Sequence, residues 1–192
     1  NTLYISNYYR LNLSIISPKQ GFNQINENLF KISIKTPAYV DLSASLKIDN
    51  IEYPRHLHTL CQRDLNQADT MNCFIAPPTD GRYEILIYAK TNDETTYQNA
   101  IHMRLNVLLM NPAITFPIIY QSFIDNRCIL IQPFQRLVNE NECICVHMKI
   151  PNARLIKIKN GNDCILPKHD EYQDGILKKK NFRKNGIVVK LI

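Results

Sequence analysis

Apolar and polar residues alternate with a period of two in several separate stretches of this 192-residue chain. A period of two places every second side chain on the same face of a β-strand. Turn-forming pairs such as Thr36-Pro37 and Asn185-Gly186 separate the stretches. No long window shows the 3.6-residue period of a helix. The chain is therefore predicted to be all-β and built from short strands. The clearest alternating stretches are 30–35, 42–48, 83–87, 101–109, 144–150 and 187–191.

An internal repeat predicts how these strands are grouped. In each half a Pro is followed by an Asn-Glu-Asn triplet, a strand, a second Pro and a closing strand led by Gly. The period is far longer than that of solenoid repeats and matches one sandwich domain. We expect two tandem immunoglobulin-like β-sandwiches, residues 1–111 and 112–192. Either the second lacks its last strand or the sequence ends before it. The matching positions are Pro18 and Pro133, 26–28 and 139–141, Pro37 and Pro151, and Gly81 and Gly186.

The segment Asp80-Gly81-Arg82-Tyr83 precedes an alternating stretch and resembles the tyrosine corner of immunoglobulin-type sandwiches. In that motif a Tyr hydroxyl bonds back to the backbone at the entry of a late strand. We therefore assign Asp80, Gly81 and Tyr83 a structural role. A disulfide-bearing immunoglobulin domain would carry Cys two residues after the Tyr, but Ile85 stands there and the chain has no Trp. This pattern indicates an intracellular sandwich.

Two segments carry a resemblance to a known family. Residues 77–90, Pro-Pro-Thr-Asp-Gly-Arg-Tyr-Glu-Ile-Leu-Ile-Tyr-Ala-Lys, resemble a segment of the KY-type immunoglobulin-like domains of the kyphoscoliosis peptidase and hillarin family. A second match begins at Phe116-Pro117 and continues through Tyr120, Phe123 and the later strand that ends at Pro151 and Ala153. In that family these domains follow a transglutaminase-like domain with a Cys-His-Asp triad. The Trp that the family places after the Pro-x-Ala strand of the second copy is missing here.

The resemblance implies a non-catalytic structural or protein-interaction module of a cytoplasmic, cytoskeleton-associated protein. Its partners would be cytoskeletal proteins, and this segment itself would not be an enzyme. The chain begins at Asn1 without an initiator Met, so we expect it to be part of a longer protein. Two alternatives stay open. The chain could be the C-terminal accessory part of a transglutaminase-like cysteine peptidase, or an extracellular adhesion pair. The oligomeric state is not predicted.

The charge is unevenly distributed. Residues 1–111 hold 10 basic and 10 acidic side chains, so the whole net charge of +6 lies in 112–192. Such a patch attracts acidic partners, anionic lipids or phosphates. Phe182 is the one aromatic residue in the basic run, which disfavours nucleic-acid binding. The competing interpretation is a solvated turn beside an edge strand. The candidate interaction patch consists of Lys178, Lys179, Lys180, Arg183 and Lys184.

Candidate chemistry is sparse. Cys61 follows His56 and His58 and precedes Asp64, which are the residue types of a nucleophile, a base and an orienting acid. In an extended chain such neighbours seldom converge. His56 and His58 would share a strand face as in some zinc sites, but a polar loop is the simpler interpretation. We therefore predict no catalytic, cofactor or metal site. The six cysteines lack a Cys-x-x-Cys pair and regular spacing, which favours reduced thiols. No apolar run is long enough to span a membrane.

Overall fold

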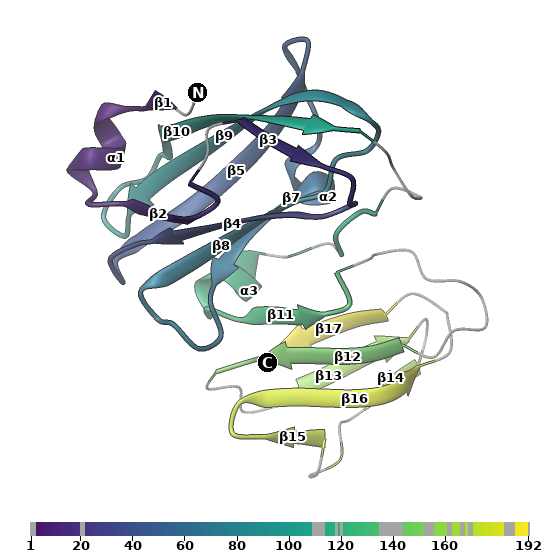
Figure 1. Cartoon of the computed structure of the whole chain (residues 1–192). Coiled ribbons are helices and arrows are strands. Elements are labelled where there is room, and N and C mark those ends of the chain that lie inside the picture. Colours follow the sequence, from purple (N-terminus) through teal and green to yellow (C-terminus); the bar gives the residue numbers. More distant parts are fainter. Residues whose placement is uncertain are drawn as a thin grey trace. The chain divides into compact units, whose positions relative to one another are not determined.

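The structure is a computed structural model of the whole chain (Figure 1). The chain divides into two compact units, Asn1–Phe116 (unit 1) and Pro117–Ile192 (unit 2). Phe116 is the last residue of unit 1, and its N–H donates to the carbonyl of Leu57 at 2.9 Å. The predicted boundary, between 111 and 112, lies outside the described residues. The structure describes residues 3–19, 22–108, 114–117, 119, 121–134, 144–151, 156–160, 163–165, 168, 171–182 and 187–191.

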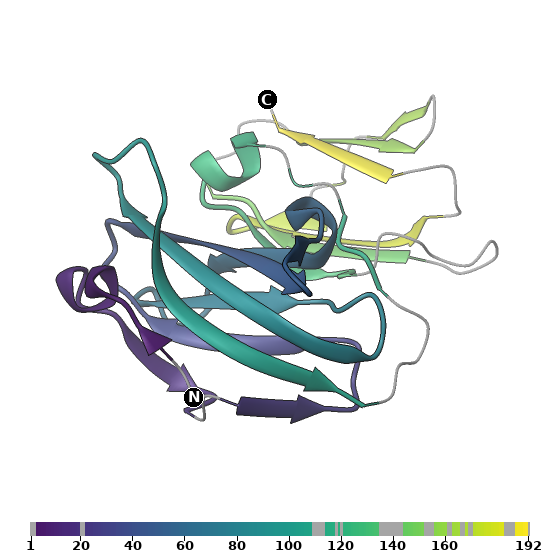
Figure 2. The same cartoon turned by 90° about the horizontal axis from the view of Figure 1, so that it is seen from above.

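The described residues of unit 1 form two sheets. In Figure 1 the strands β10, β9 and β3 of one sheet lie above β2, β4 and β8 of the other, and Figure 2 shows the same strands from above. The first sheet has the order β1-β10-β9-β5-β6, and β3 pairs in parallel with β10. The second has the order β2-β4-β8-β7. Two short helices, α1 (Ser6–Arg10) and α2 (Arg55–His58), lie between strands. The strands are β1 (Leu3–Tyr4), β2 (Ser14–Ser17), β3 (Phe22–Ile25), β4 (Phe30–Lys35), β5 (Val40–Ile48), β6 (Ile51–Glu52), β7 (Thr59–Arg63), β8 (Thr70–Ile75), β9 (Gly81–Thr91) and β10 (Gln98–Val107).

The core of unit 1 lies between these sheets and follows the alternation of the sequence. On β4 the buried residues Phe30, Ile32 and Ile34 alternate with side chains of greater exposure. On β9, Ile85 and Ile87 are fully buried. Each such aliphatic side chain contributes about 1.5–3 kcal/mol when it is removed from water. In β4 and β9 the period of two therefore encodes which face of the strand is internal.

The described residues of unit 2 also form two sheets. One has the order β11-β12-β16-β15, and the other has the order β14-β13-β17. The short helix α3 (Gln121–Asp125) precedes the first strand. Among the described residues of this unit, Val146, Met148 and Leu177 are buried apolar residues of the first sheet. The strands are β11 (Ile129–Gln132), β12 (Ile144–Lys149), β13 (Ile156–Asn160), β14 (Asp163–Ile165), β15 (Tyr172–Gln173), β16 (Ile176–Phe182) and β17 (Ile187–Leu191).

The predicted all-β class with two tandem sandwiches is confirmed. The first sheet of unit 2 repeats the order of the second sheet of unit 1, with β11, β12, β16 and β15 in the places of β2, β4, β8 and β7. The Pro that opens each repeat, Pro18 or Pro133, follows a cis peptide bond. The three helices found among the described residues have four or five residues each, too few to show a helical period in the sequence. That the second sandwich lacks its last strand stays a prediction.

Candidate functional site

Tyr83 lies at the entry of β9 with its ring buried in the core of unit 1. Its hydroxyl donates to the carbonyl of Thr79 at 2.9 Å and accepts from the N–H of Thr79 at 3.3 Å. The Thr79 hydroxyl lies 2.9 Å from the same oxygen. Gly81 adopts a φ of +143°, where a side chain would be strained, and a Cβ there would lie 3.1 Å from Cδ1 of Ile48. Tyr83 and Gly81 thus hold the turn that contains Asp80.

The lysines of the basic patch lie on a strand. Lys178, Lys179 and Lys180 belong to β16, which pairs with β12 on one side and, at its first residues, with β15 on the other. The interpretation of these three residues as a solvated turn is therefore wrong. The Lys178 side chain is exposed. Arg183 and Lys184 lie outside the described residues, and the side chains of the other two lysines are not described.

His147 lies opposite Lys178 in the register of β12 and β16. Burial lowers the pKa of His147, and the positive charge of Lys178 lowers it further. The imidazole is therefore held in its neutral form over a wider range of pH than a free histidine. An uncharged His147 leaves Lys178 as the cation of this residue pair near neutral pH.

Two residues that were candidates to assist Cys61 as a nucleophile, His58 and Asp64, have structural roles. His56 and His58 lie in α2 after Pro54, so they do not share a strand face as the zinc interpretation required. His58 is buried, and its Nδ1 lies 2.9 Å from the carbonyl oxygen of Ala76. Asp64 accepts bonds from the N–H groups of Asn66 and Gln67 and from the side-chain amide of Asn72 at 2.7 Å. These bonds, led by the one from Asn66, lower the pKa of Asp64.

The described residues contain no cluster of three or more His, Cys, Asp or Glu side chains placed to hold a metal ion. Within the same part of the chain no helix is long and apolar enough to cross a membrane.

A polar cluster on α1 escaped the sequence analysis. Asn7 is buried, and its amide donates to the carbonyls of Ala89 on β9 and Gln98 on β10, both at 3.2 Å. Its own carbonyl oxygen accepts two bonds from the Arg10 guanidinium, at 2.6 and 2.9 Å. Arg10 in turn lies 2.8 Å from the Glu94 carboxylate. The cluster fastens α1 to the ends of β9 and β10. Its partners lie 82 and 91 residues from Asn7, so no local motif signals it.

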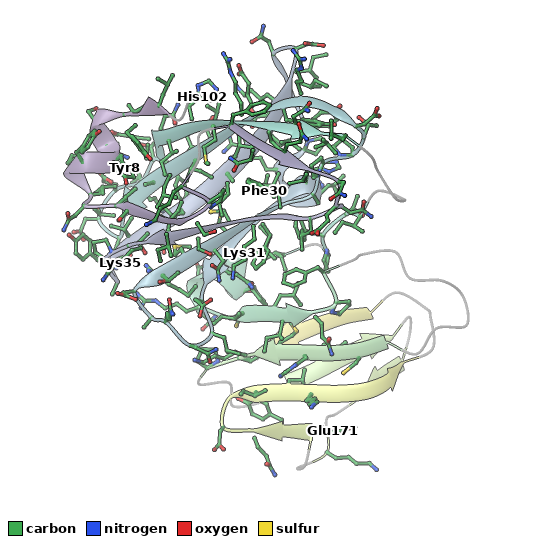
Figure 3. All side chains as sticks on the ribbon, in the orientation of Figure 1. Tyr8, Phe30, Lys31, Lys35, His102 and Glu171 are labelled. Atoms are coloured by element: carbon green, nitrogen blue, oxygen red, sulfur yellow. The ribbon has the colours of Figure 1, made fainter. Side chains whose placement is uncertain are left out.

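Three tyrosine rings gather beside this cluster. Tyr8, labelled in Figure 3, lies 4.5 Å from the ring of Tyr4 and 5.2 Å from that of Tyr9, measured between centroids. Tyr9 is 67% exposed and Tyr4 is 39% exposed. Exposed tyrosines are frequent at protein interfaces because they combine a large apolar face with a polar tip. The group is an apolar patch on the surface of unit 1.

Strand order places both units among immunoglobulin-type sandwiches. In unit 1 the orders β2-β4-β8-β7 and β10-β9-β5-β6 correspond to the ABED and GFCC′ sheets of that architecture. In unit 2 the order β11-β12-β16-β15 again corresponds to ABED, and β13 with β17 to the paired C and F strands. The residues of the Tyr83 hydroxyl network occupy the start of the F strand.

Comparison with known proteins gave one family. A family model described as "KY-like, immunoglobulin-like domain" matches residues 1–118. No curated protein matches the chain. Among solved structures, a tandem of titin Ig domains is 9% identical, with a TM-score of 0.27 and 94% of each chain covered. A chimeric titin Z1Z2 carrying a decorin peptide is 11% identical, with a TM-score of 0.31, 88% of this chain and 80% of the other covered. The strand order and the family match define the fold of the chain.

Proposed function

The chain belongs to the KY-like, immunoglobulin-like domain family, and we propose that it is a non-catalytic structural and protein-interaction module of a cytoskeleton-associated, kyphoscoliosis-peptidase-like protein. The family match over residues 1–118 carries this proposal. The sandwich supports it, because a rigid sheet scaffold presents strand edges and surface patches to a partner. The residues whose types suggested catalysis support it as well, since His58 and Asp64 are engaged in bonds that hold loops.

Recognition would use the basic surface of unit 2. Lys178 is exposed on β16 and lies opposite His147 on β12. Because His147 is neutral near pH 7, it adds no second positive charge beside Lys178. Cationic surfaces steer acidic partners, and the attraction weakens as salt screens it. The proposed partner is therefore an acidic protein surface of a cytoskeletal filament.

Co-sedimentation with filamentous actin and with intermediate filaments tests this proposal. We expect the chain to pellet with one of these filaments at low ionic strength and to be released as salt rises. Lys178→Glu should weaken pelleting, whereas Lys19→Glu, an equal change of charge at an exposed position of unit 1, should not. Failure to pellet with either filament at any salt would overturn cytoskeletal association.

The non-catalytic part of the proposal has its own test. In the accessory-part alternative, peptidase or crosslinking activity would reside in a separate transglutaminase-like domain. The purified chain should then leave a labelled peptide intact and should not crosslink it to a primary amine. Turnover that persists after further purification would show that this chain is itself an enzyme.

A further inference from the structure

Two cysteines lie opposite each other on neighbouring strands of unit 1. Cys61 belongs to β7 and Cys73 to β8, and the antiparallel register pairs them directly. The same register holds along the ladder from Thr59, opposite Ile75, to Arg63, opposite Met71. Both cysteines are free thiols in the structure. The fold therefore brings together two thiols that are separated in the sequence by a strand end and a turn.

The hydrogen bonds at the two ends of this ladder show whether Cys61 and Cys73 form a hydrogen-bonded or a non-hydrogen-bonded pair of the antiparallel sheet. The N–H of Ala76 donates to the carbonyl of His58, and the N–H of Asp64 donates to the carbonyl of Thr70. Both bonds join directly opposite residues, and hydrogen-bonded pairs alternate with non-hydrogen-bonded pairs along an antiparallel ladder. Even-numbered β7 positions therefore form the hydrogen-bonded pairs. Cys61 and Cys73 form a non-hydrogen-bonded pair.

This type of pair suits a disulfide. In a non-hydrogen-bonded pair the Cα atoms are about 4.5 Å apart and the side chains approach most closely. Disulfides span Cα separations of about 4.4–6.8 Å, so little backbone movement would be needed. The side chains also share a face of the sheet. Cys73 is fully buried in the core of unit 1, and Cys61 packs against the same core.

We propose that Cys61 and Cys73 are a cross-strand disulfide site that is oxidised by small-molecule disulfides. One cysteine loses its proton, and its thiolate attacks the reagent, forming a mixed disulfide and releasing one small thiolate. The second cysteine then loses its proton and attacks the protein sulfur of the mixed disulfide, which expels the second thiolate. The two protons go to the two released thiolates. The protein loses two electrons and the reagent gains them.

The structure also indicates how this reaction is controlled. Burial, and then the contact with Cys73, raises the pKa of the Cys61 thiol, so little thiolate is present at neutral pH. In the described part of unit 1, β7 pairs with β8 alone and forms an edge of its sheet. Opening of this edge would expose both thiols to the reagent. Oxidation should therefore be slow at neutral pH, should accelerate as pH rises, and should fasten β7 to β8 once it is complete.

Peptide-resolved thiol mapping of the whole chain tests the proposal. The protein is reduced with dithiothreitol, freed of reductant and incubated with glutathione disulfide at neutral pH and at about pH 8.5. Samples are quenched in acid, alkylated and digested for mass spectrometry. We expect a crosslinked pair of peptides containing Cys61 and Cys73, formed faster at the higher pH and lost on renewed reduction. The oxidised protein should melt at a higher temperature than the reduced protein.

Matched variants separate this pair from the other thiols. Cys61→Ser and Cys73→Ala should each abolish the crosslink and the redox-dependent shift in melting temperature. Cys128→Ser, which removes a buried cysteine of unit 2, should retain both. Full alkylation of Cys61 and Cys73 after prolonged incubation at the higher pH would overturn the proposal. A glutathione adduct that persists at either position would also overturn it. If a variant fails to fold, the peptide map of the unmodified chain decides alone.

Discussion

The hydroxyl of Tyr83 donates a hydrogen bond of 2.9 Å to the carbonyl oxygen of Thr79, four residues earlier in the chain. The same oxygen accepts from the N–H of Thr79 at 3.3 Å. One buried side chain thus satisfies both backbone groups of a single turn residue. The turn lies between β8 and β9, so the bonds fix the point at which the chain crosses from one sheet to the other.

Replacing Tyr83 with Phe should destabilise unit 1 by about 1–3 kcal/mol, because the ring is kept while two backbone groups of Thr79 lose their partner. Urea unfolding, followed by the fluorescence of the remaining tyrosines, measures the change. Tyr39→Phe is the matched control, since Tyr39 is 53% exposed, and it should change stability by less than about 0.5 kcal/mol. Equal effects of the two substitutions would mean that the hydroxyl of Tyr83 contributes nothing.

Asn7 permits a test in which charge and hydrogen bonding oppose each other. Asn7→Asp keeps an oxygen for Arg10 and adds a negative charge beside it, but it removes the amide that serves Ala89 and Gln98. A carboxylate facing two carbonyl oxygens is unfavourable, so we expect a loss of about 1–3 kcal/mol despite the new ion pair. Thermal unfolding at pH 7 measures it. Ser6→Ala, at an exposed position of the same helix, should be nearly neutral.

The raised pKa of Cys128 should make the stability of unit 2 depend on pH in the alkaline range. Burial raises the pKa of this thiol from 9.0 to about 11. Between these values the unfolded chain loses the proton before the folded chain does, so the stability of unit 2 should fall as pH rises from 9 to 11. The contribution of this one group is about 1–3 kcal/mol. Cys128→Ala costs stability at every pH but should flatten this fall, as judged by urea unfolding in the presence of reductant. An unchanged slope would contradict the assignment.

Removing the charge of Lys178 should raise the pKa of His147. Burial is the larger cause of the lowered pKa, so the value in Lys178→Gln should rise but stay below 6.5. The pKa is read from the pH dependence of the imidazole NMR signals, with Lys168→Gln as the control. Because the folded pKa is the lower one, the stability from His147 is present above pH 6.5 and is lost as pH falls below it. An unchanged pKa of His147 in Lys178→Gln would show that the charge of Lys178 does not act on the imidazole.

Strands with one buried and one exposed face could be predicted from the alternation of apolar and polar residues in the sequence. Strands whose sequence does not alternate could not. β4 and β9 show their core face directly in the sequence. All six residues of β8 are buried, including the polar Thr70 and Asn72, so this strand carries no period of two. β7 is short and partly polar, which resembles a loop when read alone. Burial on both faces depends on neighbouring strands, and a single stretch of sequence does not contain that information.

The same limit applies to the candidate sites. Tyr83 could be singled out because the turn and its Tyr are neighbours in the sequence. Asn7 could not, since its carbonyl partners belong to two strands that come 82 and 91 residues later in the sequence. The pairing of His56 and His58 on one strand face failed because Pro54 precedes a single helical turn there. The patch lysines were found by charge alone, and only the register of β12 and β16 relates Lys178 to His147.

The parallel pairing of β3 with β10 gives unit 1 a direction of mechanical resistance. Phe22 lies opposite Arg104, and Ile25 lies opposite Val107, so the two strands run the same way. Tension between the two ends of unit 1 pulls β3 backward from its first residue and β10 forward from its last. The bonds between them are then sheared together rather than opened one after another. The two-residue antiparallel pairing of β1 with β10 would instead open one bond after another under the same tension.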